Sequence, residues 1–238
     1  MVDCRCRVQR VARHPHSATG AALIPLLTGT TVDNKAHWEQ VYRTKPSETL
    51  SWHQAVPARS LELIDRTPTT EKGAIIDIGG GDSTLVDELL GRDVGPVTVL
   101  DISGAALERA RARLGPRGER VTWIEGDVTR TPLPDGAYDL WHDRAVFHFL
   151  TGEADRRRYA EVAARALRPG GTAIIATFAL DGPTRCSGLE IARYSPETLA
   201  TALGPEFELL HGFGDVHRTP SGGEQRFTYA VFRLGNAR

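Results

Sequence analysis

The 238-residue chain is poor in cysteine. Its three cysteines are Cys4, Cys6 and Cys186, and no set of Cys and His residues has the spacing of a zinc site. A disulfide framework and a structural metal are therefore excluded as the basis of folding, and we expect no metal site. Few cysteines without a paired pattern are typical of a reduced, cytoplasmic protein.

Long hydrophobic runs and an excess of charge are also missing. No apolar stretch approaches the roughly 20 residues that span a bilayer, so we expect no membrane partner. Lysine and arginine number 29 against 30 aspartates and glutamates, and this balance gives no sign of the basic face typical of a nucleic-acid-binding protein. The composition is that of a globular chain long enough to bury a large core.

Residues 1–32 differ from the rest of the chain. Four arginines in this stretch face a single acid, Asp3, and no apolar period accompanies them. We expect a flexible basic N-terminal extension, with a start site set too far upstream or an organellar transit segment as alternatives. The remaining domain, 33–238, is expected to begin with a helical lid, 33–70, in which Asp33 caps the first helix and Pro57 starts the second.

From residue 74 onward, short apolar runs alternate with amphipathic stretches. Buried strands are predicted at 74–78, 97–100, 121–124, 138–141 and 172–178, and helices at 83–90, 103–114, 154–167 and 196–203, with a further helix through about Leu150. The segments 207–212 and 227–234 alternate and predict an antiparallel pair. This order predicts an α/β fold: a Rossmann-like, doubly wound, mostly parallel sheet with an antiparallel C-terminal strand pair.

Three motifs follow the first three predicted strands, at the edge where doubly wound sheets bind ligands. The first is a glycine turn, 77–83, which lets the backbone approach a ligand closely. Asp101 follows the second strand, where a carboxylate can accept both hydroxyls of a ribose. Asp127 follows the third, where a carboxylate can accept an adenine amino group. The alternative for the glycine turn is an ordinary turn, that for Asp101 is a helix N-cap, and that for Asp127 is a turn-capping acid.

Taken in order, these motifs resemble those of the class I S-adenosylmethionine-dependent methyltransferases, and the resemblance extends from about His37 to Phe232. The turn 168–171 is similar to the turn before that family's fifth strand. The rival, a dinucleotide-binding dehydrogenase, has a small, non-branched residue where Thr84 stands, and Ser83 departs from the third glycine of the methyltransferases. The resemblance implies S-adenosylmethionine as cofactor, held by Asp77, Gly79, Gly80, Gly81, Ser83, Thr84, Asp101, Ile102, Asp127 and Val128.

A fourth motif, 139–150, resembles the D-R-G-x-x-H segment of thiopurine S-methyltransferase-like and tellurite-resistance-like proteins, and also the D-K-G-T segment of some lysine methyltransferases. The resemblance implies a catalytic set of His142, Asp143, Arg144 and His148, with His142 also bordering the cofactor. Arg144 would hold an anionic acceptor, and one of the other three would help to deprotonate the acceptor. The alternatives are that Asp143 and Arg144 cap the following helix and that His148 is a core or capping residue.

Three aromatic residues of the N-terminal segment, Trp38, Tyr42 and Trp52, resemble the residues that cover the donor in the same groups. Ring faces attract cations such as a sulfonium, and ordinary packing is the alternative. Cys186 either lines the acceptor pocket or is a packed bystander. Weaker candidates for the same pocket are His211, His217, Arg218 and Gln225.

The predicted function is methyl transfer to a small-molecule nucleophile such as a thiol. A protein lysine is the alternative acceptor, and a non-catalytic donor-binding module is the second alternative. We predict no nucleic-acid partner.

Overall fold

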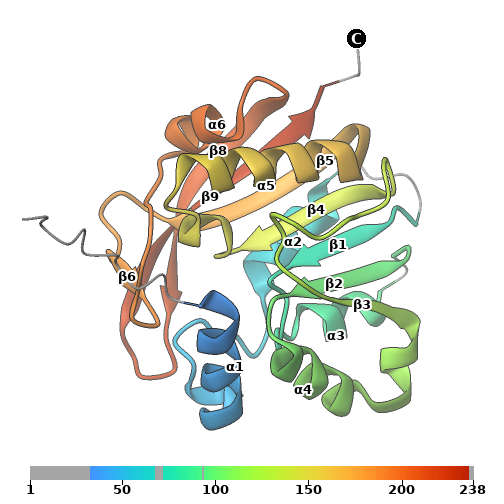
Figure 1. The fold of residues 1–238 in the computed structure, drawn as a ribbon, viewed down its shortest axis with the longest axis vertical. Helices are drawn as coiled ribbons and strands as arrows, with labels where there is room; N and C mark the ends of the chain where they lie inside the picture. The colour runs from blue at the N-terminus through green and yellow to red at the C-terminus, as the bar shows by residue number, and fades with distance from the viewer. Residues whose placement is uncertain (1–32, 68–71, 93, 236–238) are drawn as a thin grey trace, which may run out of the picture. The chain divides into compact units, whose positions relative to one another are not determined.

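The computed structural model describes residues 33–67, 72–92 and 94–235. The expected extension, 1–32, lies outside the described residues. In chain order the elements are α1 (Asn34–Thr44), α2 (Ala58–Arg66), β1 (Ile75–Ile78), α3 (Leu85–Leu90), β2 (Val97–Asp101), α4 (Gly104–Leu114), β3 (Val121–Glu125), β4 (Tyr138–Arg144), α5 (Glu153–Ala166), β5 (Leu167–Phe178), β6 (Arg185–Cys186), β7 (Leu189–Glu190), α6 (Pro196–Leu203), β8 (Phe207–Arg218) and β9 (Glu224–Leu234), drawn in Figure 1.

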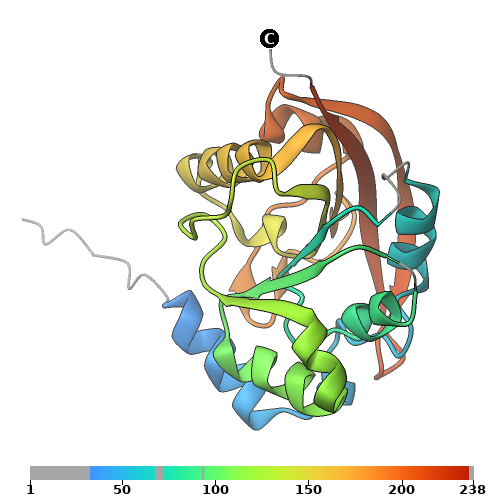
Figure 2. The same ribbon diagram turned by 90° about the vertical axis from the view of Figure 1, so that its right-hand side faces the viewer.

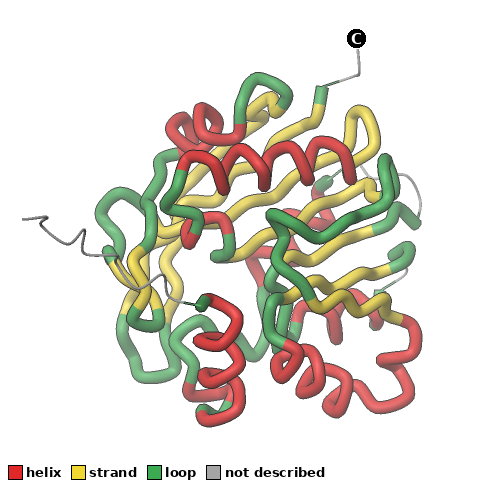
Figure 3. The backbone as a smooth tube through the Cα atoms, viewed as in Figure 1, coloured by secondary structure: helices red, strands yellow, loops and turns green. Residues whose placement is uncertain are grey.

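The central layer is a seven-stranded sheet in the order β3-β2-β1-β4-β5-β9-β8, visible as the yellow strands of Figure 3. Strands β1 to β5 are parallel, and β9 and β8 add an antiparallel edge. The strand order reverses between β1 and β4, whose residues Ile78 and Asp143 stand side by side. The carboxyl ends of these strands form the switch point at which such sheets bind ligands. The predicted fold class is therefore confirmed.

Alternation along β1 shows how the strands separate two cores. Ile76 faces the layer of α5 and α6, whereas Ile75 faces the layer of α2, α3 and α4. Figure 2 shows α5 and α2 on opposite sides of the strands. Because both faces are covered, the parallel strands read as nearly continuous apolar runs rather than as alternating ones. None of the helices in the described ranges is long and apolar enough to cross a membrane.

The N-terminal segment, 33–67, packs on the rest of the domain through α1. Asp33 caps this helix by accepting a hydrogen bond from the amide of Ala36 at 3.1 Å, as predicted. The buried residues Val41, Tyr42 and Leu50 form a small separate core with Ala106 of α4. Helix α1 therefore lies beside the helix that follows β2, close to the ligand-binding edge.

The prediction of a helix through about Leu150 is wrong. Strand β4 continues to Arg144, and only a short 3-10 turn, Phe147–Phe149, follows it. Ala145 has a φ of 78°, which an α-helix cannot contain. The amides of Val146 and Phe147 donate to the Asp143 carboxylate at 2.7 and 3.0 Å, which holds the chain in this tight turn. The small β6–β7 hairpin was also not predicted.

Candidate active site

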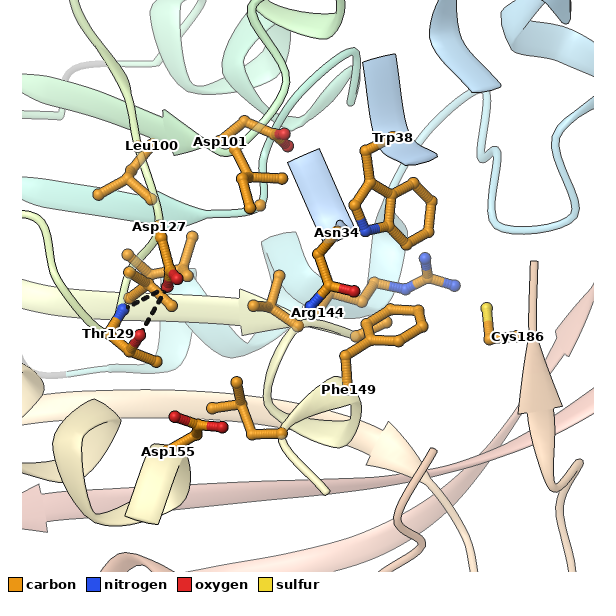
Figure 4. Close-up of a pocket in the computed structure, with 18 of the residues that line it drawn as sticks. Asn34, Trp38, Leu100, Asp101, Asp127, Thr129, Arg144, Phe149, Asp155 and Cys186 are labelled. Atoms are coloured by element: carbon orange, nitrogen blue, oxygen red, sulfur yellow. Dashed lines mark hydrogen bonds between the residues drawn. The ribbon is translucent and has the colours of Figure 1, made fainter. Parts of the chain in front are cut away.

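A cavity of about 320 Å³ opens at the carboxyl ends of β1 to β4 (Figure 4). Asp101 and Asp127 lie toward one end, called here the aspartate end, and Arg144, Phe149 and Cys186 toward the other, called here the arginine end. The volume is at the lower limit of the roughly 300–1,000 Å³ common for ligand sites. Of the predicted cofactor residues, the cavity is lined by Trp38, Tyr42, Trp52, Gly79, Asp101, Ile102, Asp127 and Val128.

The glycine turn after β1 brings the backbone against the cavity. Gly79 has a φ of 62°, and a Cβ there would overlap the Cγ2 atom of Val146. A Cβ at Gly80 would overlap Asp77 Oδ2. Gly81 also has a positive φ and lies against Asp101 and Tyr42 without lining the cavity. The turn therefore requires glycine, because the protein's own side chains leave no room for a Cβ, and the close approach to a ligand stays a prediction.

Asp101, the last residue of β2, is 5% exposed and lines the cavity. Its Oδ1 accepts from the amide of Ser103 at 2.8 Å. Burial, together with the nearby carboxylates of Asp77 and Glu39, raises the pKa of Asp101 to about 7 against the lowering effect of the Ser103 amide. Ser103, rather than Asp101, caps α4. A buried carboxylate without a cation partner is well suited to accept hydrogen bonds from two ligand hydroxyls.

Asp127 combines the two roles weighed from the sequence. Its Oδ1 accepts from the amide and the hydroxyl of Thr129, both at 2.8 Å, as a turn-capping acid does. Its Oδ2 is 3.8 Å from the Nε of Arg130. The carboxylate is partly exposed at the aspartate end, where Figure 4 shows it beside Thr129. One oxygen therefore shapes the turn while the group as a whole borders the cavity.

Aromatic rings form a wall between the two ends. Trp38 makes edge contacts with Trp52 and Phe149, with ring centroids 5.6 and 5.2 Å apart. Tyr42 packs against Trp52 at 6.2 Å. The wall joins the N-terminal segment to the turn after β4, and its ring faces are suited to a cationic ligand. Phe149 was not among the predicted cofactor residues.

A second hollow, of about 60 Å³, adjoins the cavity and shares Gly79 and Arg144 with it. The hollow is walled by the predicted residues Asp77, Gly80, Ser83, Thr84 and His142.

Inside this second hollow, His142 is engaged on both ring nitrogens. Its Nδ1 lies 2.7 Å from Asp77 Oδ1, and its Nε2 lies 2.9 Å from the hydroxyl of Ser60. All three side chains are buried. His142 therefore borders the second hollow but has no free nitrogen to offer an acceptor.

Arg144 is the only arginine or lysine that lines both hollows within the described residues. Its guanidinium donates to the carbonyl of Trp52 at 3.1 Å and to the hydroxyl of Tyr229 at 3.3 Å, and it lies 4.8 Å from the ring centroid of Phe227. None of these partners is charged, and no described carboxylate lies within ion-pair distance of Arg144. The arginine end therefore carries a positive charge without a protein counter-ion.

Cys186 lies at the same end, in the β6–β7 hairpin, and is 7% exposed. Burial raises the pKa of its thiol to about 11, against the lowering effect of Arg144. The thiol is therefore neutral, and it lines the cavity rather than reacting in it.

Two members of the predicted catalytic set, Asp143 and His148, do not line the cavity. Asp143 is fully buried and accepts from two backbone amides and from the hydroxyl of Tyr159 at 2.6 Å, so it caps the turn after β4. Burial raises its pKa to about 6. His148 is fully buried between Phe149 and Phe178, and burial lowers its pKa to about 3. The structure therefore supports the alternatives of a capping acid and a core histidine.

The weaker candidates at the antiparallel edge also lie outside the cavity. His217 contacts the carbonyl oxygen of Ser51 at 2.7 Å through Nε2, and with Arg218 it borders a separate, open hollow. His211 stacks on Phe213, and Gln225 pairs with His217 across β8 and β9. Among the described residues, no group of three or more His, Cys, Asp or Glu side chains could hold a metal ion. Cavity residues that sequence reasoning missed are Asn34, Phe149 and Asp155.

Comparison with known proteins places this geometry in a family. Residues 75–171 match the model of a methyltransferase domain. The chain is 32% identical over 183 residues to the ubiquinone/menaquinone biosynthesis C-methyltransferase of Methylobacterium nodulans, covering 71% of each chain. The chain belongs to the class I S-adenosylmethionine-dependent methyltransferases. The cofactor of this family is S-adenosylmethionine, and the predicted enzyme class is confirmed.

Other similarities support the same family. An uncharacterized methyltransferase of Mycobacterium tuberculosis is 28% identical over 116 residues, and this chain spans about half of that relative, 56%. A solved structure on the conversion of a disulfide bond into a thioacetal group in echinomycin biosynthesis has a TM-score of 0.68 at 21% identity, covering 84% of this chain and 92% of its own. A methyltransferase structure from Anabaena variabilis has a TM-score of 0.66 at 16% identity, with 84% and 94% covered. The names of these proteins refer to neither thiopurine nor tellurite, so that finer resemblance stays a prediction.

Proposed function

We propose that this methyltransferase transfers a methyl group from S-adenosylmethionine to a small, anionic nucleophile bound at the arginine end. The observation that carries the proposal is the half-buried guanidinium of Arg144, which has no carboxylate partner among the described residues and lies in the cavity that also contains Asp101 and Asp127. A charge buried without a partner is costly, and an anionic ligand removes that cost.

The aspartate end has the hydrogen-bond acceptors that an adenosyl group needs. Asp101 accepts from the ribose hydroxyls, and Asp127 accepts from the adenine amino group. Asp77, next to the glycine turn, has an oxygen left for the ammonium of the methionine part, since His142 occupies only Oδ1. When bound, the donor supplies a methyl group on a positively charged sulfur, and the rings of Trp38, Trp52 and Phe149 provide the faces that attract such a cation.

At the arginine end, the charge of Arg144 favours the ionised form of an acceptor. An opposite charge within a few ångströms lowers the pKa of an acid, and Arg144 already acts in this direction on the thiol of Cys186. A thiol has a free pKa of about 8.5, and the guanidinium shifts its ionisation toward neutral pH, whereas at the buried Cys186 the effect of burial is the larger one. We therefore assign acceptor ionisation to Arg144 rather than to a base among residues 142–148.

The same charge disfavours the alternative of a protein lysine. A lysine ammonium must enter the cavity and lose a proton there, and the guanidinium of Arg144 opposes the first step by like-charge repulsion. The cavity is also small and walled by Trp38 and Trp52 of the N-terminal segment. Several relatives have names that refer to small-molecule acceptors. Examples are a dimethylglycine N-methyltransferase and the quinone-biosynthesis enzyme.

The test uses methyl-labelled S-adenosylmethionine, the purified protein and a cell extract, followed by separation into small-molecule, protein and nucleic-acid fractions. We expect the label in small acidic molecules, and an Asp101→Ala variant should transfer less of it when the donor concentration is limiting. Label in one protein band would support the lysine alternative. No label in any fraction, with donor binding confirmed by calorimetry, would make the chain a non-catalytic donor-binding module.

A further inference from the structure

Ser60 is a buried hydroxyl that neither the sequence motifs nor the family assigns to the site. It lies in the first turn of α2, is 1% exposed, and lines the second hollow together with Asp77 and His142. The hydroxyl is 2.9 Å from His142 Nε2, and His142 Nδ1 is 2.7 Å from Asp77 Oδ1. Three residues from α2, β4 and β1 thus form one buried chain of hydrogen bonds.

The chemistry of the three groups fixes the direction of these bonds. A carboxylate only accepts, so the proton of a neutral His142 stands on Nδ1 and is donated to Asp77. Nε2 is then an acceptor, and it receives the hydroxyl proton of Ser60. Asp77 selects this tautomer, and without Ser60 no described group would bond Nε2, so the imidazole would lose the second of the two contacts that fix its orientation.

The chain of hydrogen bonds from Ser60 through His142 to Asp77, called here the relay, also sets where the second oxygen of Asp77 points. Oδ1 accepts from His142, whereas Oδ2 faces the glycine turn so closely that a Cβ at Gly80 would overlap it. No described donor bonds Oδ2. The oxygen therefore borders the second hollow with one free accepting site, and the bond from His142 keeps it in that orientation.

The N-terminal segment has further bonds to the same hollow. The carbonyl of Gln54 accepts from the hydroxyl of Thr84 at 2.9 Å, and the carbonyl of Trp52 accepts from Arg144 at 3.1 Å. Ser47 donates to Asp82, which lines the hollow as well. The Ser60 hydrogen bond is thus one of several between the N-terminal segment and the second hollow. It is the one that leads, through His142, to the carboxylate facing the glycine turn.

We propose that Ser60 is a positioning residue that acts through His142 to hold Asp77 Oδ2 toward the ammonium of the methyl donor. This inference rests on the proposed function only for the identity of the donor and is independent of the acceptor. Hydrogen bonds in a shared buried chain depend on one another. Loss of the Ser60 hydroxyl therefore weakens the hydrogen bond of Asp77 to the amino acid group of the donor and leaves the adenosine contacts unchanged.

Two ligands separate this role from a merely structural one. S-adenosylhomocysteine carries the amino acid group, and methylthioadenosine has the same adenosine and sulfur without it. By calorimetry, Ser60→Ala should bind S-adenosylhomocysteine about fivefold more weakly, the effect of losing one well-placed hydrogen bond, while its affinity for methylthioadenosine stays within about twofold. Thr177→Val, which removes a buried hydroxyl without a described partner, is the matched control and should change neither affinity.

Two further readouts sharpen the test. On an Asp77→Asn background, Ser60→Ala should have no additional effect, because the two residues act as a unit. Nitrogen NMR of the imidazole should show the Nδ1-protonated form of His142 in both the parent and Ser60→Ala, with the Nε2 signal shifted in Ser60→Ala because its hydrogen bond is lost, and His142→Gln used to assign the signals. Equal loss of affinity for both ligands, additivity with Asp77→Asn, or an unchanged Nε2 signal would overturn the relay alone. Failure of the parent chain to bind either ligand would overturn the donor site itself and this inference with it.

Discussion

The two ends of the cavity are built in different ways. At the aspartate end, Asp101 is the last residue of β2, Asp127 follows β3, and the glycine turn follows β1, so the contributing strands succeed one another in the chain. At the arginine end, Arg144 comes from β4, Phe149 from the turn after it, Cys186 from a later hairpin, and Trp52 from the N-terminal segment. The first end is thus encoded in a short run of sequence, and the second exists only after distant segments have packed.

This difference has a functional consequence in our account. The aspartate end fixes the donor by hydrogen bonds to groups that every donor molecule carries. The arginine end selects the acceptor by one charge and the shape of its walls. Changes at one end should therefore alter donor affinity or acceptor turnover, but not both, and the predictions below are ordered by the size of the expected effect.

Arg144→Gln should have the largest effect. Losing a charge-assisted contact to an anionic acceptor costs about 1.5–3 kcal/mol, so label transfer to the small-molecule fraction should fall by roughly 10- to 150-fold. Glutamine keeps a donor for the carbonyl of Trp52, and thermal unfolding serves as the control for folding. Transfer at the rate of the parent chain would remove Arg144 from the acceptor site.

Asp101→Ala should weaken S-adenosylhomocysteine binding by at least about tenfold, because two ribose hydroxyls lose a charged acceptor. Calorimetric titration measures this directly. Asp135→Ala, in an exposed position after β3, is the control and should bind like the parent chain. A dissociation constant unchanged in Asp101→Ala would show that the ribose lies elsewhere.

Donor affinity should also depend on pH through Asp101, whose pKa is raised to about 7 by burial. The ligand hydroxyls donate to the ionised carboxylate, so binding is strongest above pH 7 and weakens as the pH falls through that value. At pH 6 the affinity for S-adenosylhomocysteine should be about tenfold below its plateau.

The comparison that isolates this group is Asp101→Asn, which cannot titrate. Its affinity should be nearly constant between pH 6 and 8. The free energy of unfolding has the opposite dependence on pH. The pKa of Asp101 is higher in the folded chain than in the unfolded one, so the stability contributed by protonated Asp101 is complete below the unfolded pKa. This stability is lost as the pH rises to about 7. If Asp101→Asn retained the pH dependence of binding, another group would be responsible.

Cys186→Ala should have the smallest effect. The change removes one buried sulfur from the wall of the arginine end, and a difference of this size in an apolar pocket is worth about 1 kcal/mol. The Michaelis constant for the acceptor should change by about fivefold or less, with S-adenosylhomocysteine affinity unaltered. A complete loss of transfer would instead indicate that the thiol takes part in the reaction.

The same contrast explains what could be predicted from the sequence. The succession of strands and helices, the glycine turn and the positions of Asp101 and Asp127 at the cavity could be predicted, since each depends on residues within a few positions of a strand end. The helix after β4 was mispredicted, because the pattern gives no sign that the Asp143 carboxylate would bind the amides of Val146 and Phe147. The burial of His148 away from the cavity could not be predicted, because spacing alone does not say which side of a turn faces the core.

Contacts of the site that join segments far apart in the chain could not be predicted from the sequence. Ser60 is 82 positions from His142 in the chain, and no local motif marks it. Phe149 stood inside the fourth motif, but its contact with Trp38 depends on how α1 docks. Arg144 was predicted, and its importance rests on a fact that only the structure supplies, namely that no carboxylate lies beside it in the described chain.

The central claim is that the two ends separate donor binding from acceptor chemistry. The most direct measurement is the calorimetric affinity of Arg144→Gln for S-adenosylhomocysteine, compared with that of the parent chain. Our account predicts an affinity within about twofold of the parent, despite the large loss of transfer. A loss of affinity as large as that of Asp101→Ala would contradict it, because Arg144 would then bind the carboxylate of the donor rather than an anionic acceptor.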